Sequence, residues 1–209
     1  MDPTEPLILD PDVLAGRKLF GNDLDEAGLR AWYAAEEYGY FDLYGASGAN
    51  AGDNFPYRAI NRADAAPLRG RRFETCLVLG CAEGEDLAAL ELDIGRVIAI
   101  EPAEKFWKDS IHGVPAEFRK PTLYGAIDLP DGSVDLVVAL SVLHHIANVE
   151  RVVGELGRIL RPGGMLLIRE PIASMGDFRG PRHGLTRFER GIPVALMQGL
   201  DRKSTRLNS

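Results

Sequence analysis

A glycine-bearing turn between two apolar segments constrains the fold of this chain more than any other feature. The first segment is residues 77–79, and the second, residues 97–100, ends at Glu101. The turn after the first segment consists of Gly80, Cys81, Ala82, Glu83 and Gly84. An apolar strand, a tight turn, a short helix and a second strand that ends in a carboxylate form the βαβ unit of nucleotide-binding proteins. The pattern therefore predicts a nucleotide-like cofactor, with Glu101 reaching a ribose hydroxyl group.

Strands and helices alternate from Thr75 to Glu170, which predicts an α/β fold with a doubly wound, mostly parallel sheet. The segment 134–140 is predominantly apolar and is expected to be a strand buried on both faces. We expect the other strands at 75–79, 96–100, about 116–123 and 165–168, and helices at 85–91, 104–110 and 148–160.

Residues 1–73 lack this alternation, and we expect them to form a helical cap packed over the ends of the strands. Helices are predicted at 24–38 and 57–66. A loop of small and polar residues is predicted between them, at 45–54.

Composition restricts the class of protein. With 209 residues, 45% of them hydrophobic, the chain can form a domain with a substantial core. Its net charge of −7 repels phosphate backbones, so no nucleic-acid partner is expected. No segment approaches the roughly 20 apolar residues that span a bilayer, and no signal peptide is apparent, so we expect a soluble, cytoplasmic protein without a membrane partner. Cys76 and Cys81 are too few for a metal site, and no metal is predicted.

Acidic residues around the turn indicate which cofactor it admits. Glu83, Glu85 and Asp86 crowd the start of the helix, where they would oppose a pyrophosphate. They would not oppose a ligand that carries a positive sulfonium and an ammonium group. S-adenosylmethionine is such a ligand. A nicotinamide dinucleotide remains the alternative, because Glu101 also suits an unphosphorylated ribose.

Five motifs in order give the chain a resemblance to the class I S-adenosylmethionine-dependent methyltransferases of the bacterial small-molecule type. They cover nearly half of the chain, from Thr75 to Glu170. They are the glycine turn 79–84, the acid segment 100–102, the approach to the fourth strand at 128–138, the segment 143–146 after that strand, and the helix and its break at 155–164. The resemblance implies a Rossmann-like fold and S-adenosylmethionine as cofactor.

The same resemblance implies the residues that bind the cofactor. The family often has an acid that accepts a hydrogen bond from the adenine amino group at the position of Gly125. Adenine recognition would then fall to the backbone of Ala126 and Ile127, or to Asp128. The predicted contacts are Gly80, Cys81, Ala82, Glu83, Gly84, Glu101, Pro102, Ala126, Ile127 and Ser141.

His144 and His145 are the titratable pair nearest the expected methyl group, and they are the candidate catalytic residues. Imidazole titrates near neutral pH and suits a base that takes a proton from the acceptor. Packing, or a cap on the next helix, is the alternative role. Methyl transfer is an in-line displacement that positioning alone can support.

The expected function is methyl transfer to a small-molecule acceptor. Residues 141–144 lack the Asn-Pro-Pro-aromatic motif of enzymes that methylate amide or adenine nitrogens, which with the acidic charge disfavours DNA. A NAD-dependent oxidoreductase and an inactive cofactor-binding fragment remain alternatives.

The C-terminal segments carry separate expectations. Residues 171–200 are expected to form a loop on the acceptor side. Residues 201–209 match the in-frame translation of a common sequencing adapter, so we expect a non-native tail and a chain cut off near Leu200. The distal strands of the family would then be missing, and the fifth strand would be an open edge prone to aggregation.

Overall fold

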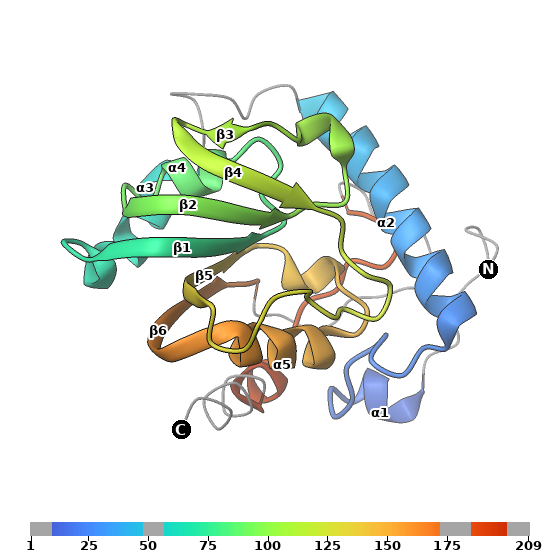
Figure 1. Cartoon of the computed structure of the whole chain (residues 1–209). Coiled ribbons are helices and arrows are strands. Elements are labelled where there is room, and N and C mark those ends of the chain that lie inside the picture. The colour runs from blue at the N-terminus through green and yellow to red at the C-terminus, as the bar shows by residue number, and fades with distance from the viewer. Residues whose placement is uncertain (1–9, 48–56, 172–184, 200–209) are drawn as a thin grey trace.

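A six-stranded sheet with the order β3-β4-β2-β1-β5-β6 organises the molecule (Figure 1). The computed structural model describes residues 10–47, 57–171 and 185–199. Its strands are β1 (Arg72–Leu79), β2 (Asp93–Ile100), β3 (Ser110–Ile111), β4 (Val114–Arg119), β5 (Val134–Leu140) and β6 (Leu160–Arg169). All neighbouring strands pair in parallel except β3 and β4. The predicted doubly wound, mostly parallel sheet is therefore confirmed.

The central strands are apolar because both faces of the sheet are covered. Every residue of β5 is buried. Leu77 and Val137 pack on one face with the inner side of α5 (Val149–Ile159), and Val78 and Val138 pack on the other. Asp135, in β5, accepts the backbone N–H of Thr75 in β1 at 2.7 Å. Parallel strands buried in this way align their carboxyl ends at one edge, where ligands bind in such folds.

Helix α2 (Glu26–Ser47) passes in front of that edge, as Figure 1 shows. Trp32 anchors it by stacking on Phe188, with ring centroids 4.9 Å apart. Other described helices are α1 (Pro11–Leu14), α3 (Arg58–Asp64), α4 (Glu85–Ala88), a short helix at 194–199, and the 3-10 turns η2 (Ala66–Leu68), η3 (Glu104–Phe106) and η4 (Leu143–His145). Among the described helices, none combines the length and the apolar character needed to cross a membrane.

Two predictions between β2 and β5 were wrong. The helix expected at 104–110 is a single 3-10 turn, after which β3 and β4 form a hairpin around His112 and Gly113, both with positive φ. The third long strand ends at Arg119, so Thr122 and Leu123 lie outside it. The turn at 112–113 reverses the chain early, which moves the strand towards the N-terminus.

Other predicted boundaries shift for local reasons. Helix α2 continues to Ser47 through positions predicted as a loop, and α4 is one turn long. Strand β6 begins at Leu160, before the glycine pair predicted to separate it from the helix. The pairing of β6 with β5 shifts register between Val134 and Leu136, which accommodates the extra residues of β6 between Leu160 and Met165. Pro162 is tolerated there because β6 is the edge strand of the described sheet.

Some predictions fall on residues outside the described ranges. These include residues 48–54 of the predicted loop, residues 172–184 and 200 of the acceptor-side segment, and the tail at 201–209.

Candidate active site

A pocket of about 500 Å³ lies at the carboxyl ends of β1, β2 and β5. Tyr33, Glu36 and Glu37 of α2 form part of its wall. Eight of the ten predicted cofactor contacts line it: Gly80, Cys81, Ala82, Glu101, Pro102, Ala126, Ile127 and Ser141. The other two, Glu83 and Gly84, do not. The topology thus brings most of the predicted residues to one cavity.

Left-handed backbone conformations occur at several residues that line this pocket. Gly80 has φ +62°, Ala82 +43° and Ser141 +54°. A Cβ on Gly80 would lie 2.5 Å from Cγ2 of Val142, so glycine is required there for space as well as conformation. Non-glycine residues in this region are strained and are retained mostly at functional sites. The turns after β1 and β5 therefore bring bare backbone to the edge of the pocket.

The carboxylate of Glu101 is held at the pocket by two backbone donors. One oxygen accepts the N–H of Ala82 at 2.9 Å, and the other accepts the N–H of Ala103 at 3.0 Å. Burial raises the pKa of Glu101, and these hydrogen bonds oppose the rise. Each carboxylate oxygen can accept a further hydrogen bond. The geometry suits recognition of a neighbouring pair of hydroxyl groups.

The two candidate histidines have different surroundings. His144 is buried, and its Nδ1 lies 2.6 Å from the Glu170 carboxylate. That carboxylate also accepts the backbone N–H groups of Val142 and Leu143, each at 2.7 Å. His144 does not line the pocket. It therefore serves to fix the turn after β5.

His145 lines the pocket. Its Nδ1 lies 2.7 Å from the carboxylate of Glu36, which is buried on α2. Glu36 also accepts the N–H of Phe188 at 2.7 Å and the hydroxyl of Thr186. Because an ionised carboxylate only accepts hydrogen bonds, Nδ1 is the donor, and in neutral His145 the lone pair is on Nε2.

The comparisons with known proteins agree with this geometry. Residues 77–168 match the family model described as a methyltransferase domain. The segment contains the glycine turn, Glu101 and both histidines. It is a class I S-adenosylmethionine-dependent methyltransferase domain. Of the two cofactors that the sequence left open, the match supports S-adenosylmethionine.

Two bacterial proteins are among the relatives of this methyltransferase domain. An uncharacterized methyltransferase of Mycobacteroides abscessus is 29% identical over 64% of this chain. A probable S-adenosylmethionine-dependent methyltransferase of Mycolicibacterium smegmatis is 34% identical over 46% of it. The chain covers only 52% and 37% of these two proteins.

A solved structure shares the fold. The S-adenosylmethionine-dependent methyltransferase LMAJ004091AAA of Leishmania major superposes with a TM-score of 0.64. The likeness covers 88% of this chain and 78% of that one at 16% identity. It supports the Rossmann-like arrangement of the methyltransferase domain.

The structure around Ile127 differs from what adenine recognition by its backbone would need. Its N–H donates to Glu155 at 3.0 Å, and its carbonyl accepts from Arg158 at 2.7 Å. Because the one backbone N–H of Ile127 donates to Glu155, it cannot also donate to adenine. Asp128, which is exposed and lines the pocket, is the better candidate. An acid cannot replace Gly125, because φ there is +77° and a Cβ would lie 2.5 Å from Val152.

Asp86 is a pocket residue that the sequence-based set of contacts missed. Its carboxylate accepts from Asn61 at 2.6 Å and lies 3.7 Å from Arg169. Burial raises the pKa of Asp86. In the sequence, the position of Asp86 at the start of the helix after the glycine turn was the signal that could have identified it as a pocket residue. With Glu101, it places two acids beside the turn, which fits a cofactor with positive groups.

Arg190 joins the C-terminal segment to the turn after β5. Its guanidinium donates to the carbonyls of His144 at 3.2 Å, Ile146 at 2.7 Å and Ala147 at 3.1 Å. It also lies 4.9 Å from the ring centroid of Trp32. Burial lowers the pKa of Arg190 to about 10, a value at which it stays charged at neutral pH. Nothing in the sequence around it indicated this role.

Proposed function

We propose that this chain transfers a methyl group from S-adenosylmethionine to a small-molecule acceptor. The observation that carries the proposal is the buried Glu101 carboxylate, held at the end of β2 inside a pocket that also contains the glycine turn. The activity is a proposal for the whole protein because the chain spans only part of its relatives.

The cofactor would extend along the edge of the sheet. Glu101 accepts both ribose hydroxyl groups, and the backbone of the turn from Gly80 to Ala82 faces the methionine part. Asp86 offers a carboxylate to the ammonium group. Asp128 accepts from the adenine amino group. Bound in this way, the cofactor supplies an electrophilic methyl group on a positive sulfur.

The acceptor would lie between α2 and the turn after β5. Tyr33, Glu37 and His145 line this part of the pocket. With the cofactor bound, the acceptor atom would displace S-adenosylhomocysteine from the methyl carbon. Nε2 of His145 takes the acceptor proton, and Glu36 stabilises the imidazolium that results. Of the two predicted catalytic histidines, only His145 is given this role.

Two features favour a small molecule as the acceptor. The pocket is enclosed on one side by α2, and its volume of about 500 Å³ suits a small ligand beside the cofactor. Its lining carries Glu36, Glu37, Asp86 and Glu101, which repel a phosphate backbone.

Calorimetric titration with S-adenosylhomocysteine, alongside NAD, tests the cofactor assignment. We expect saturable binding of S-adenosylhomocysteine at one site and none of NAD. Glu101→Ala should weaken binding at least about tenfold, because a hydrogen bond to a charged group contributes roughly 1.5–3 kcal/mol. Glu104→Ala is the matched control, since its carboxylate is exposed and pairs with Lys120. Binding of NAD instead, or equal affinities in both variants, would contradict the assignment.

A further inference from the structure

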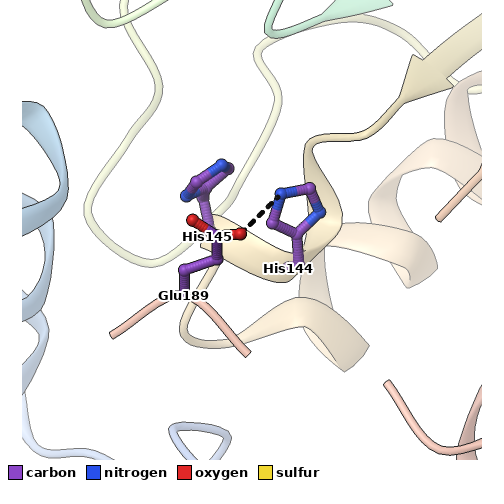
Figure 2. A group of neighbouring side chains, drawn as sticks. All are labelled: His144, His145 and Glu189. Atoms are coloured by element: carbon purple, nitrogen blue, oxygen red, sulfur yellow. Dashed lines mark ion pairs between the residues drawn. The ribbon is translucent and has the colours of Figure 1, made fainter. Parts of the chain in front are cut away.

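His144, His145 and Glu189 come together, as Figure 2 shows. Of the three, His145 also lines the pocket. The two histidines come from η4, and Glu189 comes from a segment more than forty residues later in the chain. We propose that these three side chains form a binding site for a divalent transition metal ion of the Zn²⁺ or Fe²⁺ type. The proposal goes beyond the proposed function. An ion bound here would take the Nε2 lone pair of His145, so it would replace that residue as the base of the proposed function.

The spacing of the three side chains suits a single ion. One ligand atom from each residue lies within 4.8 Å of the other two. Nε2 of His144 and Oε1 of Glu189 are 3.8 Å apart. Metal–ligand bonds of about 2.0–2.2 Å place adjacent ligand atoms roughly 3.0–3.5 Å apart. To reach that separation the Glu189 side chain, which is 17% exposed and accepts the backbone N–H of Thr186 at 3.2 Å, would have to rotate.

The partners of the histidines are those found around metal ions. Nδ1 of His144 contacts Glu170 at 2.6 Å, and Nδ1 of His145 contacts Glu36 at 2.7 Å. A histidine that binds a metal through one nitrogen usually donates its other N–H to a carboxylate or carbonyl. The two carboxylates thus fix both rings in the tautomer whose Nε2 lone pair can bind a cation.

The local charge also favours a cation. Glu36, Glu170 and Glu189 bring three negative charges, and the first two are almost fully buried. Arg190, whose charge interacts favourably with Glu36 and Glu170, brings one positive charge. Buried charges are costly unless they are balanced. A divalent ion bound by two neutral histidines would bring the net charge of these groups to zero. Protonation of both histidines would do the same.

The donor set selects the class of metal. Two imidazoles and one carboxylate bind Zn²⁺ in hydrolases and Fe²⁺ in oxygenases, and leave positions open for a substrate atom. Hard ions such as Mg²⁺ prefer oxygen ligands only. Because His145 also lines the pocket, an ion here would adjoin the acceptor and could bind its nucleophilic atom.

Zinc binding to the full chain tests the site without any activity measurement. Metal-free protein is titrated with Zn²⁺ by calorimetry, and bound metal is counted after dialysis by mass spectrometry. We expect one equivalent per chain, and affinities at least tenfold weaker in Glu189→Gln and His145→Gln. His112→Gln is the matched control, because this histidine is exposed and pairs with Glu85 instead. Its affinity should equal that of the wild type.

Cobalt(II) and thermal melts give two further readouts. Co²⁺ bound here should show visible d–d bands without the thiolate charge-transfer band that Cys76 or Cys81 would produce. If a variant fails to fold, the wild type still tests the site. Zn²⁺ bound to the folded wild type should raise its melting temperature. No zinc uptake by the wild type, a thiolate band, or equal uptake in the Glu189→Gln and His112→Gln variants would overturn the proposal.

Discussion

At the cofactor end of the pocket, Glu101 bonds to backbone groups 19 residues before it and 2 residues after it in the chain. At the acceptor end, Glu36 bonds to groups 109 and 152 residues away, and Arg190 reaches back 46 residues to His144. One βαβ unit thus contains the first end almost completely. The second end exists only when α2, η4 and the segment around Glu189 meet.

This difference separates two kinds of information in the chain. The cofactor end depends on backbone geometry. Glycine positions and the apolar pattern within a short stretch of the sequence indicate that geometry. The acceptor end depends on buried polar side chains that satisfy one another across the fold. Mutations at the two ends should therefore have different consequences, and the following predictions test this.

The largest effect is expected for Arg190→Met, which removes the guanidinium that donates to three carbonyls of the turn after β5. The carbonyl of His144 keeps the backbone N–H of residue 190 as a donor. Loss of a buried charged partner costs about 3–5 kcal/mol. Urea denaturation should show this decrease in the free energy of unfolding. Arg71→Met, at an exposed position, should change it by less than about 0.5 kcal/mol. A similar decrease in the free energy of unfolding in both variants would show that Arg190 does not hold the acceptor end together.

His145→Gln should lower the rate of methyl transfer about 100-fold once an acceptor is found, because a positioned base contributes roughly 10²–10⁴. Affinity for S-adenosylhomocysteine should stay within about threefold, since the cofactor end is intact. The dependence of the rate on pH should lose its acidic limb. A variant that keeps this limb would show that His145 is not the base.

Gly80→Ala compared with Gly70→Ala separates conformational strain from crowding. Both glycines have positive φ, but a Cβ on Gly80 would meet Val142 at 2.5 Å, whereas the space around Gly70 is open. Gly70→Ala should cost about 1–2 kcal/mol of unfolding free energy. Gly80→Ala should cost roughly 1–3 kcal/mol more and weaken cofactor binding. Equal costs in thermal melts would mean that the turn relaxes without loss.

The smallest effect is expected in the pH dependence of stability at Glu101. Burial raises its pKa in the folded protein above the ordinary 4.5. The folded state therefore binds this proton more tightly than the unfolded state does. That contribution is fully present below pH 4.5 and is lost as pH rises through the raised pKa.

Unfolding free energies of the wild type and Glu101→Gln, measured from pH 4 to pH 7, provide the check. The wild type should lose stability relative to the variant as the pH rises. Parallel curves would show that the hydrogen bonds from Ala82 and Ala103 cancel the effect of burial.

The sequence alone determined the sheet and the cofactor end. Alternating apolar segments predicted four of the five expected strands within a few residues, and the spacing of Gly80 and Glu101 placed both at one pocket. These features repeat with the period of a single element or lie within one βαβ unit, so local pattern is enough to identify them.

Tertiary structure decided what the pattern could not contain. The hairpin of β3 and β4, the bond from Ile127 to Glu155 and the choice of His145 over His144 depend on contacts between separate elements. Glu36 is an acid within an ordinary helical segment, and only its burial against His145 suggests the role proposed for it. The burial of a side chain and its contacts with residues distant in the sequence arise from packing. They are therefore present only once the chain has folded.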